Sequence, residues 1–229
     1  GARDFGIDLS ADANLAFSDD IDGQARTGTW DIGADEFIDT VPNAPTSLGP
    51  ASSTDGSWTA STSPSLTFSL SDPDTADTVK YQIQIATSSN FSSLTIDYTS
   101  ATSTQGARSF IVGQATGNGS YTVGSQNQTL TENSYYWRVM TYDNTNATSS
   151  WLTANSGSIA FKIDITAPTG TTLSWGAIAA STITISATSS DAGSGLNSLP
   201  FYYEYDENTT SSFGTADGNS GWTASTTYT

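Results

Sequence analysis

The sequence predicts an all-β protein, with one complete β-sandwich flanked by two incomplete β modules. Hydrophobic residues make up 35% of the 229 residues and charged residues only 13%, so solubility rests on Ser, Thr, Asn and Gly. Ser and Thr compete for backbone hydrogen bonds inside helices, whereas Thr fits a half-exposed strand. Short segments in which apolar and polar residues alternate recur along the chain. Two proline-containing linkers, at residues 41–45 and 165–168, separate three modules.

The first module, residues 1–40, has isolated apolar residues between turns rich in Gly and Asp, and it is too small to bury a core of its own. Residues 22–26 read Asp-Gly-Gln-Ala-Arg, and residues 30–37 read Trp-Asp-Ile-Gly-Ala-Asp-Glu-Phe. These two stretches resemble the closing segment of bacterial secreted right-handed parallel β-helix proteins. The resemblance implies that residues 1–40 are the C-terminal cap of such a helix, with its earlier coils upstream.

The second module, residues 41–165, carries the clearest strand patterns. The alternating segments are residues 66–70, 79–85, 110–112, 121–123, 135–141 and 159–163. Turn residues separate these segments, and Gln84 is expected on the outer face of its strand. About seven short strands in a unit of roughly 120 residues predict an antiparallel β-sandwich.

Two of these segments also resemble strands of a known domain family. Residues 79–86 read Val-Lys-Tyr-Gln-Ile-Gln-Ile-Ala, and residues 135–139 read Tyr-Tyr-Trp-Arg-Val. They are similar to the third and sixth strands of fibronectin type III and related immunoglobulin-like domains. The resemblance implies that Tyr135 is a corner tyrosine, that Trp137 faces the core and that Arg138 faces outward. The module is therefore expected to be an immunoglobulin-like (fibronectin type III-like) sandwich, a fold with many uses.

The third module, residues 166–229, is predicted to be a partial second immunoglobulin-like β-sandwich. Its strand patterns lie at residues 173–175, 183–187 and 201–205. Residues 191–195, Asp-Ala-Gly-Ser-Gly, resemble a connection found in bacterial immunoglobulin-like surface repeats. No counterpart of the 135–141 segment follows, and half a sandwich leaves strand edges unpaired. The sequence therefore predicts that residues beyond 229, or another chain, complete this module.

Charge and missing residue types exclude several classes of function. A formal net charge of −17, from 23 acidic and 6 basic residues, repels nucleic acid and anionic membranes. The chain has no Cys and no His, which excludes thiol nucleophiles, Ser-His triads and the usual zinc sites. Asp31, Asp35 and Glu36 form the densest carboxylate cluster, but neighbours on a strand point to opposite faces. We therefore expect no enzyme activity, and no membrane insertion because no apolar run approaches about 18 residues.

Two Asp-rich loops are candidate calcium sites. The candidate ligands are Asp72, Asp74 and Asp77 on one loop, and Asp19, Asp20 and Asp22 on the other. Hard divalent cations prefer carboxylate oxygens, and these spacings allow several oxygens to face one point, although neither loop has the EF-hand pattern. The alternative is that these carboxylates accept hydrogen bonds from the amides of their own turns.

Aromatic side chains point to a second candidate ligand, an extracellular glycan. Tyr and Trp present flat apolar faces with a polar tip, which suits stacking on a sugar ring. The candidates are Trp58, Trp151 and Tyr136, with Tyr98 and Tyr202 as further aromatics expected on turns or outward faces. The alternative is a place in the core, which is where most aromatic side chains of a sandwich lie.

The leading interpretation is a spacer in a large extracellular or cell-surface protein, similar to adhesins in which a β-helix precedes tandem immunoglobulin-like repeats. Its partners would be neighbouring modules or copies of the same chain, and strand addition at incomplete modules would build a filament. The alternative is a non-catalytic, glycan-binding accessory region of a secreted β-helix enzyme that degrades polysaccharides. Both interpretations place the chain outside the cell, with calcium as the one candidate cofactor.

Overall fold

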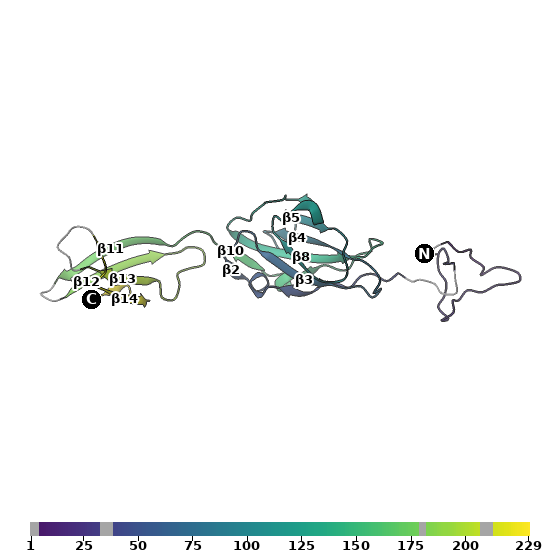
Figure 1. The fold of residues 1–229 in the computed structure, drawn as a ribbon, viewed down its shortest axis with the longest axis horizontal. Helices are drawn as coiled ribbons and strands as arrows, with labels where there is room; N and C mark the ends of the chain where they lie inside the picture. Colours follow the sequence, from purple (N-terminus) through teal and green to yellow (C-terminus); the bar gives the residue numbers. More distant parts are fainter. Residues whose placement is uncertain (1–4, 33–38, 179–181, 207–212) are drawn as a thin grey trace.

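The computed structural model describes residues 5–32, 39–178, 182–206 and 213–229. Within these ranges it contains fifteen β-strands and three short 3-10 helices, so the predicted all-β class is confirmed. The 3-10 helices are η1 (Ala51–Ser53), η2 (Thr116–Asn118) and η3 (Ala154–Gly157). No helix in the described ranges is long and apolar enough to cross a membrane. Figure 1 shows the three modules in a row, with the central module between the two ends of the chain.

The smaller sheet of the central module has the strand order β1-β3-β6. Its antiparallel strands are β1 (Thr46–Gly49), β3 (Ser65–Leu70) and β6 (Gly106–Ile111). As the alternation predicts, Leu66, Phe68 and Leu70 of β3 are buried. Phe110 of β6 pairs with Leu66 and is fully buried as well, so one face of this sheet belongs to the core.

The larger sheet has the strand order β2-β10-β8-β4-β5-β7, with β9 paired to β8. Its strands are β2 (Ser57–Thr59), β4 (Lys80–Ala86), β5 (Leu94–Ser100), β7 (Gly119–Val123), β8 (Asn133–Tyr142), β9 (Leu152–Thr153) and β10 (Phe161–Ile163). All pairs in this sheet are antiparallel except β2 and β10, which run parallel. Along β8 buried and half-buried residues alternate, as predicted for residues 135–141, and Trp137 is among the buried ones.

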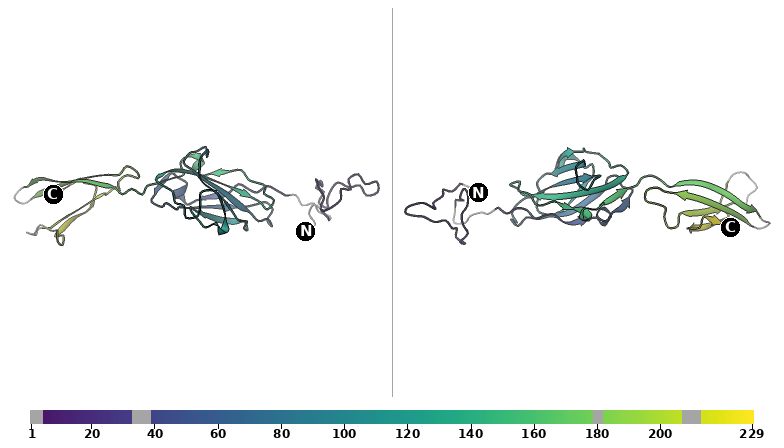
Figure 2. Two further views of the ribbon diagram at one scale, coloured as in Figure 1. Left: turned by 90° about the horizontal axis from the view of Figure 1, so that it is seen from above. Right: turned by 180° about the vertical axis from the view of Figure 1, so that it is seen from behind.

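The two sheets of the central module face each other (Figure 2), and one hydrophobic core lies between them. Aromatic rings meet across it: the ring centroids of Phe68 and Tyr81 are 4.8 Å apart, and those of Tyr98 and Phe110 are 5.1 Å apart. The expectation that Tyr98 lies on a turn or outward face is wrong, because the side chain is fully buried. Tyr98 pairs with Ile83, and directly paired residues share one face of a sheet, so Tyr98 faces the core with Ile83.

Burial of Tyr81 in this core is expected to make the sandwich less stable as the pH rises above about 10. Burial raises the pKa of the Tyr81 hydroxyl from 10.0 to about 12. Between these values the unfolded chain ionises this tyrosine and the folded chain does not, so ionisation favours unfolding. We expect this residue to lower the free energy of unfolding by about 1.4 kcal/mol per pH unit from about pH 10 to pH 12. Urea unfolding at several pH values measures it, and an unchanged slope in Tyr81→Phe would contradict it.

Tyr135 forms a short local contact at the start of β8. Its hydroxyl donates a hydrogen bond to the backbone carbonyl oxygen of Thr131, 3.0 Å away and four residues upstream. Its ring is stacked on Phe161 of β10, with the ring centroids 5.4 Å apart. The side chain therefore fastens the chain entering β8 to the strand itself and to its neighbour.

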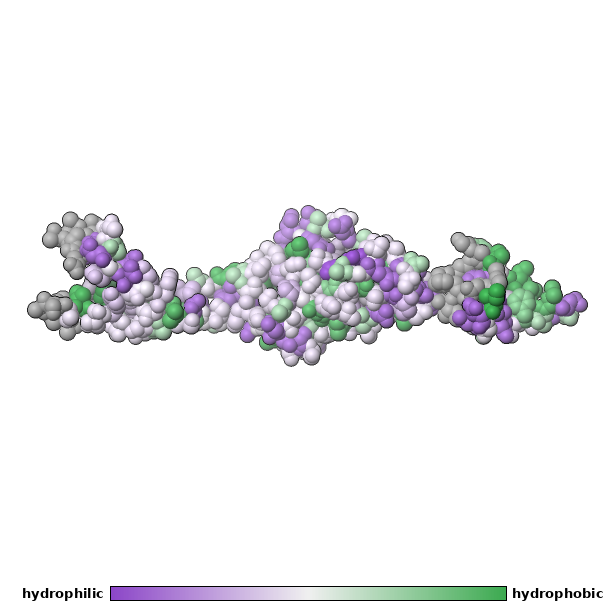
Figure 3. All heavy atoms as spheres, turned by 60° about the horizontal axis from the view of Figure 1, so that its bottom comes forward, coloured by the Kyte–Doolittle hydropathy of each residue, from purple (hydrophilic) through white to green (hydrophobic). Residues whose placement is uncertain are grey.

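The first module contains turns and one isolated bridge, between Asp19 and Ala25, but no strand within residues 5–32. Its small core is aromatic, since the ring centroids of Phe17 and Trp30 are 5.2 Å apart and the Arg26 guanidinium lies over both rings. Figure 3 shows apolar residues gathered on the surface of this module. Residues 5–32 form no coil of stacked strands, and the β-helix cap stays a prediction from the sequence.

The third module consists of two small sheets. One contains β11 (Thr169–Ile178), β12 (Ile183–Ser190) and β15 (Thr227–Tyr228), and the other pairs β13 (Phe201–Tyr205) with β14 (Gly218–Thr223). Among the described residues of this module, Ile185 and Tyr203 are the only buried apolar side chains. A cavity of about 840 Å³ is lined by residues of both sheets, including Leu173 and Trp175, which are 61% and 63% exposed. The two sheets therefore share much less core than those of the central module.

Candidate metal centre

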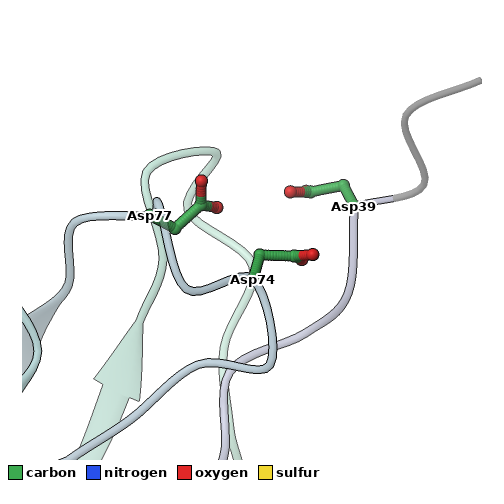
Figure 4. A group of neighbouring side chains, drawn as sticks. All are labelled: Asp39, Asp74 and Asp77. Carbon is green, nitrogen blue, oxygen red and sulfur yellow. The ribbon is translucent and has the colours of Figure 1, made fainter.

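Five Asp carboxylates gather at one end of the central sandwich, and we call this group the acidic pocket. Its members come from the linker before β1, taken from here on to include residues 39 and 40, from the loop between β3 and β4, and from the turn after β8: Asp39, Asp72, Asp74, Asp77 and Asp143. Figure 4 shows Asp39, Asp74 and Asp77 pointing toward a common space. Segments far apart in the sequence thus place oxygen ligands together.

The loop between β3 and β4 is held in shape by hydrogen bonds to its own backbone. The Asp72 carboxylate accepts a bond from the Asp74 amide (2.8 Å), and the Asp77 amide donates to the Asp74 carbonyl oxygen (2.9 Å). Gln105 completes this frame, because its side-chain oxygen accepts from the Asp72 amide and its side-chain nitrogen donates to the Asp74 carbonyl oxygen. The carboxylates of this loop are therefore presented by a fixed backbone.

The spacing of three carboxylates fits a single divalent cation. One oxygen from each of Asp39, Asp74 and Asp77 lies within 4.8 Å of the other two. Calcium binds oxygen at about 2.3–2.6 Å, so two ligands on opposite sides of the ion are about 4.6–5.2 Å apart. Within the described residues, no other three Asp or Glu side chains bring their oxygens this close together.

Three carboxylates of the acidic pocket are buried, and each leaves one oxygen without a hydrogen-bond partner. Asp72, Asp77 and Asp143 are 4%, 7% and 1% exposed, and the unpaired atom is Oδ2 in each of them. The other oxygen is satisfied: in Asp77 it accepts from the Asn144 side-chain amide (2.8 Å), and in Asp143 from the amides of Thr145 and Ala147 (both 2.8 Å). A buried oxygen without a partner costs about 1–3 kcal/mol, more if it is charged, and a bound cation removes this cost.

The pKa of the Asp72 carboxyl reflects how close the neighbouring carboxylates lie. Burial raises the pKa of the Asp72 carboxyl most, and the neighbouring carboxylates of Asp74, Asp77 and Asp143 raise it further, while the Asp74 amide opposes the shift. Two like unit charges 4–5 Å apart repel by about 3–4 kcal/mol at an effective dielectric constant near 20. The carboxylates of the acidic pocket therefore repel one another, and a divalent cation among them would attract each of them.

Comparison with protein-family models, with curated proteins and with solved structures gave no match. What the acidic pocket can bind therefore follows from its own atoms. Each of its five members offers only carboxylate oxygens, and the chain has no His or Cys. Such a donor set suits Ca²⁺ or Mg²⁺ rather than zinc or copper.

The structure places the Asp72, Asp74 and Asp77 candidates on one loop, as the sequence suggested, and adds two members that sequence reasoning missed. Asp39 precedes Asp74 by 35 residues and Asp143 follows it by 69, so no local spacing connects them. Residues 143–146, Asp-Asn-Thr-Asn, are rich in oxygen-bearing side chains, but this composition by itself predicts only a turn.

The second candidate calcium loop is not assembled as a metal site. The carboxylates of Asp19, Asp20 and Asp22 do not come within reach of one ion. Instead the Asp20 carboxylate accepts hydrogen bonds from the amides of Asp22 (2.9 Å) and Gln24 (2.8 Å). This is the alternative in which a carboxylate satisfies the amides of its own turn. Of the candidate catalytic residues, Asp35 and Glu36 lie outside the described part of the chain.

Two of the aromatic candidates for glycan binding, Trp151 and Trp58, each have a cation over the ring. Arg138 lies between two rings on the outer face of the larger sheet, 4.3 Å from the centroid of Phe91 and 4.4 Å from that of Trp151. Its guanidinium also donates two hydrogen bonds to the Gln84 side-chain oxygen, at 2.9 and 2.7 Å. One face of Trp151 is therefore occupied, and Gln84, on the outer face as expected, is only 8% exposed because this stack covers it.

The remaining aromatic candidates do not form a common platform with Trp151. Trp58 is 41% exposed, but the Lys162 ammonium lies 4.6 Å from its ring centroid. Tyr136 is half-buried on β8, and Tyr202 lies in the third module, 5.3 Å from the ring of Trp222. The contacts of Trp58 and Tyr202 fit structural cation-π and ring contacts.

Proposed function

We propose that this chain is a non-catalytic structural segment of an extracellular or cell-surface protein, and that its central sandwich binds Ca²⁺ in the acidic pocket. The observation that carries the proposal is the Asp77 carboxylate, which belongs to the three-carboxylate group, is buried and leaves its Oδ2 without a hydrogen-bond partner. Buried charges in proteins are paired or bind metal ions. A bound cation would join the linker before β1 to the loop between β3 and β4.

Calcium is favoured over magnesium by the nature of the ligands. Ca²⁺ accepts six to eight oxygens in irregular arrangements, whereas Mg²⁺ demands a near-ideal octahedron and keeps most of its water. The acidic pocket offers several carboxylates on loops of unrelated direction. Extracellular modules bind Ca²⁺ with dissociation constants of about 10⁻⁴–10⁻³ M, and we expect an affinity of this order if the chain lies outside the cell.

A structural role is supported by the arrangement of the central module. Its two facing sheets, β1-β3-β6 and the larger sheet with β8 next to β4, support the proposal that the module is an immunoglobulin-like or fibronectin type III-like sandwich. The hydrogen bond from Tyr135 to Thr131 agrees with the predicted corner tyrosine. A sandwich of this kind has many uses, and the polar Ser- and Thr-rich composition favours a spacer among them.

Calorimetric titration of the EDTA-treated chain with Ca²⁺ tests this proposal. We expect one ion per chain, a dissociation constant of about 10⁻⁵–10⁻³ M and weaker binding of Mg²⁺. At about 100 times the dissociation constant, binding adds about 2.7 kcal/mol, which raises the Tm of the sandwich by about 5–10 °C. No heat of binding and no Tm shift at about 10 mM Ca²⁺ would contradict the proposal.

A further inference from the structure

We propose that Ca²⁺ in the acidic pocket fastens the linker at residues 39–43 to the central sandwich, so that the junction with the first module depends on the cation. This inference rests on the proposed calcium site and adds a regulatory role to it. Asp39 belongs to the linker, whereas Asp74 and Asp77 belong to the sandwich, yet all three offer oxygens to one point (Figure 4). A single ion would thus bridge the two parts.

The linker already lies along the loop between β3 and β4. The Thr40 amide donates to the Asp74 carboxylate (2.7 Å), and the Asp39 carboxylate accepts from the Thr145 hydroxyl (2.8 Å). Three residues on, the Asn43 amide donates to the Ser71 carbonyl oxygen (3.0 Å). The linker is therefore held in position for Asp39 to reach a bound ion without rearrangement.

The Asp39 carboxylate shares a hydrogen-bond donor, the Thr145 hydroxyl, with the Asp143 carboxylate. The Thr145 hydroxyl lies 2.8 Å from an oxygen of Asp39 and 2.8 Å from an oxygen of Asp143, and its single hydrogen can serve only one of them at a time. Asp39 is exposed and sits on a linker, while Asp77 and Asp143 are buried. Repulsion among the carboxylates is therefore relieved most easily when Asp39 and the linker move away. Calcium reverses this tendency because it attracts all of them.

Amide hydrogen exchange of the full chain, followed by NMR with and without Ca²⁺, tests the inference at Thr40. The matched control is Ser57, whose amide donates to the Asp55 carboxylate (2.9 Å) in a turn away from the acidic pocket. We expect saturating Ca²⁺ to slow exchange of the Thr40 amide about tenfold or more, and that of the Ser57 amide less than about twofold. Asp39→Asn also removes one of the three convergent carboxylates, so its Ca²⁺ concentration is raised until calorimetry shows the variant to be saturated through the sandwich residues. Under that condition we expect the effect at Thr40 to fall to the level of the control.

Calorimetric titration of the same samples separates the two ways of failing. If Ca²⁺ binds the wild-type chain and Thr40 exchange is unchanged, the role of the linker is wrong while the calcium site stands. If Thr40 is slowed equally in Asp39→Asn, Asp39 is not the bridging ligand and the inference is also wrong. If no Ca²⁺ binds, the site and the inference fail together.

Discussion

Replacing Trp137 with Ala is expected to unfold most of the central sandwich at 25 °C. The side chain is the largest of those fully buried in the core, and its Nε1 donates to the Ser53 carbonyl oxygen at 2.7 Å. Truncating a buried Trp costs about 3–5 kcal/mol, and leaving the Ser53 carbonyl oxygen without its partner adds about 1–3 kcal/mol. The sum is comparable to the whole stability of a typical domain, about 5–15 kcal/mol.

Urea unfolding followed by tryptophan fluorescence and circular dichroism measures this loss. The matched control is Trp222→Ala in the third module, where the side chain is 67% exposed and its removal should cost less than about 1 kcal/mol. If Trp137→Ala unfolds within about 1 kcal/mol of the wild type, the described core is wrong. If Trp137→Ala loses much of its free energy of unfolding and Trp222→Ala does not, the central sandwich unfolds as one cooperative unit around the described core.

Replacing Asp77 with Asn is expected to weaken Ca²⁺ binding about 100-fold or more, which is about 2.7 kcal/mol. The substitution removes one negative charge from the acidic pocket and one of the three convergent carboxylates. An Asn oxygen can still accept the hydrogen bond that Asn144 donates to Asp77, so the loop keeps its local support. Because one source of repulsion is removed, the Ca²⁺-free variant should be at least as stable as the wild type. The variant thus loses stability relative to the wild type only when Ca²⁺ is present.

Thermal unfolding in EDTA and in saturating Ca²⁺ measures both expected effects: no loss of stability without Ca²⁺, and a loss relative to the wild type with Ca²⁺. Asp55→Asn is the control, because it changes the net charge by the same amount at an exposed turn and leaves the acidic pocket intact. We expect Asp55→Asn to keep the wild-type response to Ca²⁺. Wild-type affinity in Asp77→Asn, or a large loss of stability in EDTA, would show that Asp77 supports the fold rather than a cation.

The strands of the central sandwich could be predicted because one face of each strand is buried. In β3 and in β8 every second residue faces the core that both sheets share. This period of two residues is visible in the sequence as alternating apolar and polar residues. The extent of burial on the outer face could not be predicted in this way. Gln84 is buried by Arg138, which lies 54 residues further along the chain, so its environment depends on the pairing of β4 with β8.

The acidic pocket was only partly predictable for a similar reason. Asp72, Asp74 and Asp77 are near neighbours in sequence, so their convergence on one loop could be proposed from spacing alone. Asp39 and Asp143 reach the pocket because the linker crosses one end of the sandwich and β8 ends beside the same loop. These approaches are tertiary, and no local pattern encodes them.

The parallel pairing of β2 and β10 has a mechanical consequence for the central module. The chain enters the larger sheet through β2 and leaves it through β10, so tension along the chain pulls these two parallel strands in opposite directions. The hydrogen bonds between them lie across the line of force and bear the load together, as does the contact of Lys162 with Trp58. Forced unfolding is governed by the rate of such a rupture rather than by equilibrium stability. A tether built on this sandwich would resist stretching in a moving fluid even if its free energy of unfolding were modest.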